Sequence, residues 1–264
     1  MGIYSMEKIT AVANDKIKYA VRLSSSGSFR RENREFFLEG ARLCSDAAGC
    51  GINIAKAFFT RDALDKYNDY IDIIISKCNE CFEIGNDVAK KIGDTQSTQG
   101  VFCICEIPDE DSVKLNPLGR YLALENVQDP SNFGAISRSA EAIGLDGLIV
   151  SGGCDIYNPK ALRAAMGSSL RLPVITADNL PEFLKEAKSK GIKTYASVPL
   201  NSATDIRNIS REGGIICCIG NEGNGLTEET KAACDELITI PMQGRAESFN
   251  ASAAAAIIAW ELKR

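Results

Sequence analysis

The stretch GIICCIGNEGNGLTEE (214–229) decides the fold of this chain. It begins with a buried-looking apolar strand, continues with three glycines within six residues, and ends on Thr227 before two glutamates, which is typical of a helix start. A glycine-rich loop between a strand and a helix lets the backbone meet a ligand closely. No Lys-Ser/Thr follows the glycines, and GNEGNG does not match G-x-G-x-x-G, so it is neither a Walker loop nor a dinucleotide fingerprint. Taken alone, the loop fits a connecting polar turn equally well.

The same alternation of strand and helix extends in both directions, from Arg120 to the C-terminus. The apolar runs are YLALENV, GLIVSG, LPVIT, IKTYASV, GIICCIG and ELITIPM. Asp129 and Asn158, each followed by proline, indicate helix starts, and Gly144 fits a helix end. This order predicts an α/β domain with a parallel sheet and helices on both faces. The stretch ESFNASAAAAIIAWELKR (247–264) predicts a C-terminal helix.

A second segment, ENVQDPSNFGAISRSAEAIG (125–144), follows the first of these strands, and ligands of such sheets bind at the carboxyl ends of strands. Helical spacing places Ser131, Gly134 and Arg138 near one face. A glycine beside an arginine permits close approach of a phosphate. The alternative for Arg138 is a surface salt bridge.

A third segment, IPMQGRAESFNASAAAA (240–256), follows the last strand. A glycine-containing loop leads to Ser248 and Asn250, which we expect to open the final helix. The alternative is that Ser248 simply caps that helix.

The first half of the chain is less regular. It contains a charged, helical-looking stretch, NREFFLEGARLCSDAAG (33–49), and two runs that look like strands, IDIIIS (71–76) and GVFCICEI (100–107). The polar segment PDEDSVKLNPLG (108–119), with a proline and a glycine near its end, predicts a linker. We therefore divide the chain into an N-terminal domain at 1–108, a linker at 109–119 and a second domain at 120–264.

A local basic patch lies in the first half, although the chain has a net charge of −5. The overall acidity counts against a strong nonspecific nucleic-acid binder. Within residues 16–34, six basic side chains face one acid, a local charge of +5 around the flexible-looking stretch SSSGS (24–28). The patch is a candidate for docking structured RNA through phosphates, and the alternative is an ordinary solvated loop. Its members are Lys16, Lys18, Arg22, Arg30, Arg31 and Arg34.

Several classes of chemistry are excluded by composition. There is no histidine, which removes the commonest general base and every Ser-His or Cys-His nucleophile pair. No apolar run approaches the roughly 18 residues of a membrane span. The start, MGIYSMEKITAV, lacks the long apolar core of a secretory signal, so we expect a cytoplasmic protein.

The ten cysteines are expected to be core thiols. Cys78-x2-Cys81 and Cys103-x-Cys105 are compatible with a zinc site. However, Cys103 and Cys105 alternate inside a predicted strand, and free cysteine behaves as a small buried hydrophobe. We therefore expect no metal.

In this order, the three segments resemble the SpoU family of RNA 2′-O-methyltransferases, also called the TrmH family. The matching strings are NFGAISRSA (132–140), IGNEGNGL (219–226) and IPMQGRAESFNASAAAA (240–256), and the likeness covers roughly residues 118–264. In the first half, FFLEGARLCSDAA and TQGVFCICE resemble the small α/β, ribosomal-protein-like substrate domain that precedes the catalytic domain in members acting on ribosomal RNA.

The resemblance implies a fold and a cofactor. The C-terminal sheet would carry a deep trefoil knot, as in the wider SPOUT superfamily, which general rules of chain connection disfavour. S-adenosylmethionine would bind within the knotted loops, largely through main-chain contacts at Gly220, Ile240 and Phe249, next to Met242 and Ser248. Leucine is usual at 249 and valine is common at 251, where this chain has phenylalanine and alanine. The complete predicted cofactor site is Gly220, Asn221, Gly223, Gly225, Leu226, Ile240, Met242, Ser248 and Phe249.

The resemblance also implies a reaction, in which a ribose 2′-oxygen attacks the sulfonium methyl. Arg138 matches the family's essential arginine. Its pKa above about 12 makes it a poor base, so clamping the RNA phosphate is at least as good a role for it as proton removal. The other predicted catalytic residues are Asn132, Glu222, Ser248 and Asn250. They would hold loops and ribose by hydrogen bonds, and Glu222 is a second candidate base.

Partners follow from the same resemblance. Family members are dimers whose knots pack together, so both protomers would build the active site. The added N-terminal domain favours ribosomal RNA as the substrate. The alternatives are a tRNA methyltransferase of the same family, a non-catalytic RNA-binding protein on this fold, and an enzyme that binds a nucleotide or NAD.

Overall fold

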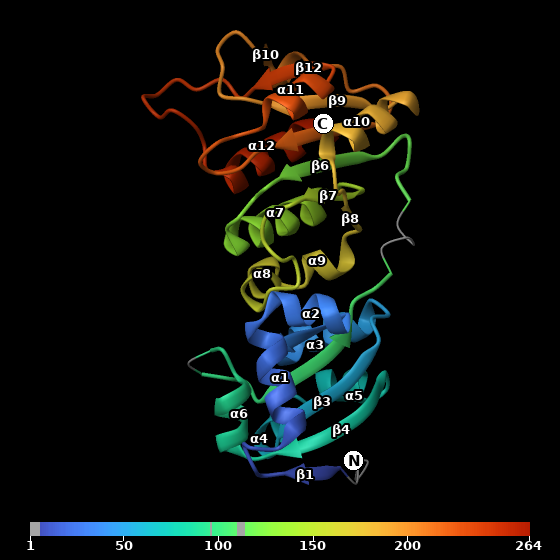
Figure 1. Ribbon diagram of the computed structural model, residues 1–264, viewed down its shortest axis with the longest axis vertical. Coiled ribbons are helices and arrows are strands. Elements are labelled where there is room, and N and C mark those ends of the chain that lie inside the picture. Colours follow the sequence, from blue (N-terminus) through green and yellow to red (C-terminus); the bar gives the residue numbers. More distant parts are fainter. Residues whose placement is uncertain (1–5, 96, 110–113) are drawn as a thin grey trace. The chain divides into compact units, whose positions relative to one another are not determined.

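The computed structural model describes residues 6–95, 97–109 and 114–264 (Figure 1). The chain divides into two compact units, which are described separately. One unit comprises Met1–Pro108 with Tyr157–Arg163, and the other comprises Asp109–Ile156 with Ala164–Arg264. Part of the expected linker, residues 110–113, lies outside the described residues.

The N-terminal unit is built on a five-stranded mixed sheet in the order β1-β4-β3-β5-β2. Strands β1, β4 and β3 are parallel, whereas β5 runs antiparallel to both β3 and β2. The strands are β1 (Glu7–Ile9), β2 (Glu35–Glu39), β3 (Ile54–Thr60), β4 (Cys78–Ile84) and β5 (Val101–Glu106). The helices are α1 (Asp15–Ser25), α2 (Gly27–Asn33), α3 (Ala41–Gly49), α4 (Arg61–Lys66), α5 (Asn68–Ile75) and α6 (Asn86–Ile92).

Three expectations about this unit were wrong. The run 71–76, expected as a strand, lies mostly in α5, because the buried Ile71 and Ile74 are one helical turn apart while Ile73 is exposed. The stretch 33–49, expected to be helical, contains strand β2 before helix α3, and the two are separated by Gly40 at φ 111°. The stretch 24–28 is no flexible loop, because Ser24 and Ser25 belong to α1, Gly27 and Ser28 belong to α2, and the Ser26 side chain between them caps α2.

The C-terminal unit is built on a seven-stranded sheet in the order β10-β12-β9-β11-β6-β7-β8, and every neighbouring pair is parallel. This confirms the predicted parallel sheet. The strands are β6 (Arg120–Glu125), β7 (Gly147–Ser151), β8 (Val174–Thr176), β9 (Lys193–Ser197), β10 (Thr204–Asp205), β11 (Ile215–Ile219) and β12 (Glu236–Thr239). The helices are α7 (Pro130–Ile143), α9 (Ser168–Arg171), α10 (Leu180–Ser189), α11 (Glu228–Ala233), α12 (Ala251–Lys263) and the 3-10 helix η2 (Ile206–Asn208). Helix α8 (Pro159–Ala165) includes the boundary between the two units, which falls after Arg163.

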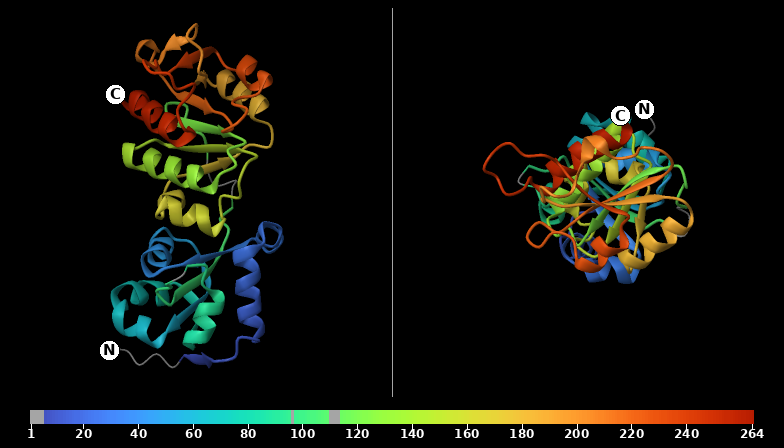
Figure 2. Two further views of the ribbon diagram at one scale, coloured as in Figure 1. Left: turned by 90° about the vertical axis from the view of Figure 1, so that its left-hand side faces the viewer. Right: turned by 90° about the horizontal axis from the view of Figure 1, so that it is seen from above.

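The helix ends follow the predicted local signals. The Asp129 side chain caps α7 with proline at its first position, Thr227 caps α11, and Gly144 ends α7 in the left-handed conformation at φ 83°. Helices cover both faces of the sheet, with α7 and α12 on one face and α10 and α11 on the other (Figure 2). The buried face under α10 and α11 is apolar and includes Leu184, Ile216 and Cys218.

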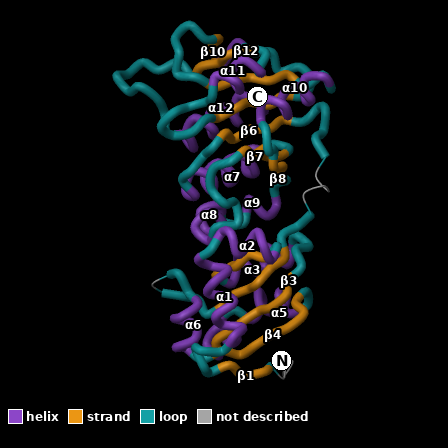
Figure 3. Tube along the Cα trace, in the orientation of Figure 1, coloured by secondary structure: helices purple, strands orange, loops and turns teal. Residues whose placement is uncertain are grey.

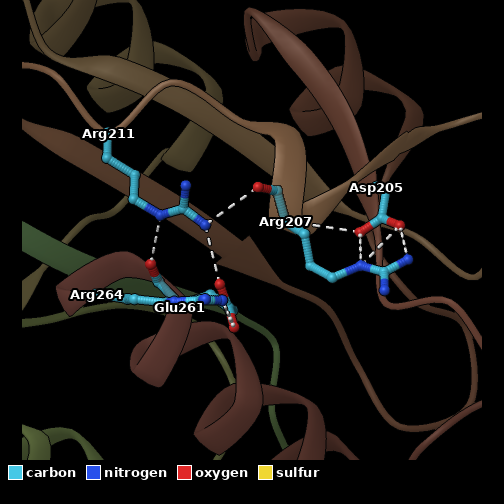
Figure 4. A network of polar contacts seen from close by, with 5 residues as sticks. All are labelled: Asp205, Arg207, Arg211, Glu261 and Arg264. Atoms are coloured by element: carbon cyan, nitrogen blue, oxygen red, sulfur yellow. Dashed lines mark hydrogen bonds and ion pairs between the residues drawn. The ribbon is translucent and has the colours of Figure 1, made fainter.

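The C-terminal helix returns past β9 to pack on α7, β6 and β11, and these two strands lie three and two places from β12 in strand order. Arg211 holds it there by donating from Nε to the Glu261 carbonyl at 2.8 Å and from Nη2 to the Glu261 carboxylate at 2.9 Å (Figure 4). In the same network Arg207 pairs with Asp205, and Arg264 lies 3.7 Å from Glu261. The chain between β12 and α12 therefore has to span this return as a loop (Figure 3).

Candidate active site

The three predicted segments emerge at the carboxyl ends of neighbouring parallel strands. Strands β6 and β11 pair directly, with Leu124 opposite Ile219, so the segments that follow them lie side by side. Strand β12 is separated from β11 by β9 alone. The loop after Ser197 on β9 thus opens between two of the predicted segments. Sequence reasoning missed it because strand order is not visible in a pattern of apolar runs.

The glycine loop has a closed, defined shape. Asn221 and Gly225 exchange two backbone hydrogen bonds of 3.0 and 2.9 Å, and Gly225 has φ 69°. A Cβ on Gly220 would lie 2.2 Å from the backbone carbon of Gly225, so a side chain at 220 would break the turn. The Asn221 Oδ1 accepts from the N–H groups of Gly223 and Asn224. The sequence therefore uses glycine where close backbone approach requires it.

Glu222 ties this loop to the segment after β6. Its carboxylate accepts from the Asn132 amide at 2.8 Å and from the backbone N–H groups of Gln128 and Asp129, both at 3.2 Å. Burial opposes ionisation, but the hydrogen bonds from Asn132 and from backbone N–H groups outweigh it, so the pKa of Glu222 lies below its ordinary value. A carboxylate with a lowered pKa and three donors is a poor general base, and this geometry favours a positioning role.

Asn132 extends the connection to the third segment. Its side chain is 8% exposed, and its Oδ1 accepts from the Asn250 Nδ2 at 3.1 Å. The Asn250 Oδ1 caps α12 by accepting from the N–H groups of Ser252 and Ala253. A hydrogen-bond chain from Asn250 through Asn132 to Glu222 thus joins all three segments. The alternative in which Ser248 caps the final helix is wrong, because the cap is Asn250 and the helix begins at Ala251.

Arg138 is exposed on α7. Across residues 6–95, 97–109 and 114–264, no side chain or carbonyl forms a hydrogen bond or ion pair with it, so the expected alternative of a surface salt bridge is wrong for the described chain. Gly134 does not lie open beside it. Gly134 is buried in the face of α7 that packs in the domain core, so it cannot provide the approach for a phosphate that its spacing suggested.

Comparison with known proteins decides the family. The sequence model of the SpoU rRNA Methylase family matches residues 119–260, more than half of the chain, and the MRM3-like substrate binding domain matches residues 14–103. The chain belongs to the SpoU rRNA methylase family. Members of this family carry the trefoil knot, so the knot implied by the resemblance is confirmed at the level of the family fold.

Relatives match this SpoU methylase over nearly its whole length. It is 29% identical over 98% of its chain, and over all of the relative, to the 23S rRNA (guanosine(2553)-2'-O)-methyltransferase RlmP of Bacillus subtilis. The AdoMet-bound rRNA methyltransferase of Sinorhizobium meliloti superposes with TM-score 0.86 and 27% identity over 97% of both chains. The SpoU methyltransferase AviRb of Streptomyces viridochromogenes, in complex with AdoMet, gives TM-score 0.85 and 25% identity over 95% of this chain and 97% of its own.

The loop between β12 and α12 contains several of the predicted cofactor residues, and their apolar side chains are partly exposed. Ile240 and Met242 are half-buried, and Phe249 is 43% exposed. Ser248 is exposed and forms no hydrogen bond with the described part of the chain. Leu226, at the end of the glycine loop, is buried. Apolar side chains beside exposed main-chain groups form the kind of surface that accepts an aromatic base and its polar edges.

The predicted RNA-binding residues of the N-terminal unit are arranged on two helices. Lys18, Arg22, Arg31 and Arg34 are exposed, and the Arg22 guanidinium lies 4.0 Å from the centre of the Phe29 ring. The half-buried Lys16 lies 4.8 Å from the Phe82 ring centre and 3.7 Å from Glu7.

Arg30 departs from this pattern. It is only 2% exposed, and its Nη1 donates to the carbonyls of Leu23 and Ser24 at the end of α1. The prediction that Arg30 belongs to an accessible basic patch is therefore wrong, because its buried guanidinium donates to the last carbonyls of α1.

Three further expectations concern the cysteines, metal binding and membrane spans. The expectation that the cysteines are core thiols is confirmed for Cys103 and Cys105 in β5 and for Cys217 and Cys218 in β11, all fully buried, and for the buried Cys44 and Cys234. It is wrong for Cys50, which is exposed, and for Cys78, Cys81 and Cys154, which are half-buried, because these four lie where the surface is only partly covered. Within the described ranges, no group of three or more histidine, cysteine or acidic residues is arranged to hold a metal ion. Of the helices that the structure describes, none is both long and apolar enough for a membrane span.

Polar residues at the end of β6 were missed by sequence reasoning. Asn126 adopts φ 54°, and its carbonyl accepts from the Asn221 side chain at 2.9 Å. Its neighbour Glu125 is a buried carboxylate. The signal was present, because these two polar residues stand at the carboxyl end of an apolar strand, where ligands of such sheets bind.

Proposed function

We propose that this chain transfers a methyl group from S-adenosylmethionine to a ribose 2′-oxygen of RNA. The observation that carries this proposal is the hydrogen-bond chain Asn250–Asn132–Glu222, which joins the three family segments at the carboxyl ends of the sheet. Such an arrangement holds loops in one geometry around a ligand that lies between them. Membership of the SpoU family and AdoMet-bound neighbours of the same fold support the assignment.

The residues present fit the cofactor. The glycine loop is exposed at Gly223 and Gly225, where no side chain keeps a ligand from the backbone, and Ile240, Met242 and Phe249 offer apolar surface for an adenine ring. When bound, S-adenosylmethionine supplies a methyl group on a positively charged sulfur, which is already activated toward nucleophilic attack. The chain's own task is to hold the cofactor and the RNA in line, and alignment of this kind contributes several kcal/mol to a barrier.

Arg138 is proposed to grip the RNA phosphate next to the reacting ribose. Its fork of donors is exposed and unpaired within the described chain, and the planar guanidinium matches a phosphate in two-point contact. Glu222 already accepts three hydrogen bonds, so we assign proton removal to water rather than to this carboxylate. Ser248, exposed beside Phe249, is proposed to contact the cofactor or ribose through its hydroxyl.

Ribosomal RNA is the proposed substrate class. The relative acting on 23S rRNA matches 98% of this chain, including the N-terminal unit. The exposed cations Lys18, Arg22, Arg31 and Arg34 of that unit are proposed to contact RNA phosphates. We further propose a homodimer whose protomers share the active site, with the exposed Trp260 of α12 in the contact. The expected cytoplasmic location stays a prediction.

Calorimetry and a methyl-transfer assay test this function together. Titration with S-adenosylmethionine should show one site per protomer, and folded protein that binds none at millimolar ligand would contradict the proposal. Arg138→Lys keeps the charge but loses the two-point geometry, so methyl transfer should fall nearly to background while cofactor affinity stays unchanged. Arg207→Lys is the matched control, because this exposed arginine pairs with Asp205 and should tolerate the change. Full activity of the Arg138→Lys enzyme would remove Arg138 from the mechanism.

A further inference from the structure

Glu125, the last residue of β6, is a buried carboxylate held by neutral donors. It is 8% exposed. One oxygen accepts from the Thr227 N–H at 2.8 Å, and the other accepts from the Thr227 hydroxyl at 2.8 Å and from the Thr230 hydroxyl. Among residues 6–95, 97–109 and 114–264, no lysine or arginine forms an ion pair with it. Burying a charge without a cation is costly, and here only hydrogen bonds offset that cost.

These three hydrogen bonds fix the trailing end of the glycine loop. Thr227 directly follows Leu226, the last residue of the predicted cofactor segment, and Thr230 is completely buried in α11. Glu222 holds the leading part of the same loop to the segment after β6. Two carboxylates therefore join the loop to β6 and the segment that follows it. Glu222 belongs to the loop and accepts from the segment after β6, whereas Glu125 belongs to β6 and accepts from the end of the loop.

The arrangement of donors around position 125 favours an acceptor with no proton of its own. The Thr227 Oγ1 already accepts from the Thr230 N–H at 3.2 Å, as the cap of α11. The Thr227 N–H and the Thr230 hydroxyl proton point at position 125. The single Thr227 hydroxyl proton lies nearer to Glu125, at 2.8 Å, than to the Thr230 Oγ1, at 3.1 Å. A carboxylate that only accepts is the side chain that matches all of these donors. A glutamine of the same size would turn N–H groups toward at least one of these donors.

We propose that Glu125 is a positioning residue for cofactor binding, which acts through Thr227 and Thr230 to hold the glycine loop in its ligand-ready shape. The inference rests on the proposed function, because the loop's ligand is the cofactor assigned there. Without these hydrogen bonds, the loop would be free to sample other shapes. Each binding event would then have to reorder it, which lowers affinity without touching the reacting atoms.

The experiment compares Glu125→Gln with the wild type in the full-length protein. The Kd of S-adenosylmethionine by calorimetry should rise about 10-fold, which is about 1.4 kcal/mol. The KM for S-adenosylmethionine should rise in parallel, while kcat at saturating cofactor should stay within about twofold, because the catalytic arginine is untouched. Hydrogen exchange should accelerate at residues 220–227.

Glu39→Gln is the matched control. Glu39 is also a buried carboxylate at a strand end, 7% exposed, and accepts from the Asp94 N–H and the Thr95 hydroxyl in the N-terminal unit. It should lose stability to a similar degree and keep the wild-type cofactor Kd. Thr230→Val removes one donor only and should raise the Kd about threefold, so it tests the proposal even if Glu125→Gln does not fold.

The outcomes distinguish a failure of the positioning role of Glu125 from a failure of the proposed methyl-transfer function. If Glu125→Gln or a folded Thr230→Val protein binds S-adenosylmethionine as the wild type does, the positioning role is refuted and the proposed function stands. A reduced number of binding sites at unchanged Kd also refutes it, because the carboxylate would then serve folding alone. If the folded wild type binds no S-adenosylmethionine, the proposed function itself fails.

Discussion

The substitution Asn132→Asp tests the hydrogen-bond chain directly, because it exchanges one amide nitrogen for an oxygen and preserves shape. The Asn132 Nδ2 donates to Glu222 at 2.8 Å, so the variant would place two carboxylates next to each other. Loss of a hydrogen bond to a charged group costs about 1.5–3 kcal/mol. Repulsion between two charges about 4 Å apart adds roughly 1–4 kcal/mol, and the lower part of that range applies because Glu222 is partly solvated. We expect a total loss of roughly 2.5–5 kcal/mol at neutral pH, out of a typical total of about 5–15 kcal/mol.

The loss should depend on pH in a defined direction. Next to Glu222, the new carboxyl should have a folded-state pKa above its unfolded value of about 3.9. The penalty is therefore absent below that unfolded pKa and grows as pH rises through the folded pKa. In the protonated form the new hydroxyl can donate to Glu222 as the amide did. Urea unfolding of variant and wild type at about pH 5 and about pH 8 should show the larger difference in unfolding free energy at the higher pH.

Asn179→Asp adds the same charge at the cap of α10, where the side chain accepts from the Glu182 N–H, and should cost little at either pH because aspartate caps as well as asparagine. If Asn132→Asp loses the same stability at both pH values and keeps the wild-type Kd for S-adenosylmethionine, Asn132 does not hold the loops through Glu222. The three segments would then owe their geometry to packing alone.

Three further predictions address the cap, the RNA surface and the assembly. Asn250→Ala should cost about 0.5–2 kcal/mol in chemical unfolding, and a neutral result would contradict its role as the cap of α12. Changing Arg22, Arg31 and Arg34 together to alanine should weaken RNA binding and leave the cofactor affinity unchanged. The slope of log affinity against log salt concentration should become shallower by about 0.7–0.9 for each phosphate that is no longer neutralised. If the variant binds RNA as tightly as the wild type, the RNA docks elsewhere. Sedimentation should give about twice the 28.5 kDa chain mass, and Trp260→Glu should yield a monomer if the exposed face of α12 forms the dimer interface; a wild-type monomer at assay concentration would refute the shared site.

The C-terminal fold was predictable because its signals are local. Proline after Asp129, glycine at 144 and threonine at 227 each act on the adjacent backbone, and all three mark helix ends in the structure. The N-terminal unit was harder. The isoleucine-rich run 71–76 favours a strand by composition, whereas burial against neighbouring helices selects a helix there. Tertiary packing thus overrode local preference.

The candidate site divides in the same way. The positions of Asn132, Glu222 and Asn250 were identified by ordered motifs, but their mutual hydrogen bonds depend on which strands are neighbours. Gly134 and Arg30 show the opposite case. Spacing predicted Gly134, and charge predicted Arg30, to lie on a ligand-facing surface, but the structure buries both. Gly134 packs in the buried face of α7, and Arg30 donates to carbonyls at the end of α1.

By itself, the sequence determined the alternation of strands and helices, the glycine loop and the identity of the polar residues that follow each strand. Those properties are short-range, since they depend on steric limits and hydrogen bonds within a few residues. Only the tertiary structure decided that β11 lies between β9 and β6, that α12 returns to α7, and that Glu125 meets Thr227 and Thr230 about a hundred residues away. Such contacts form because burial of the whole sheet outweighs the entropy of bringing distant segments together, and no local pattern encodes that balance.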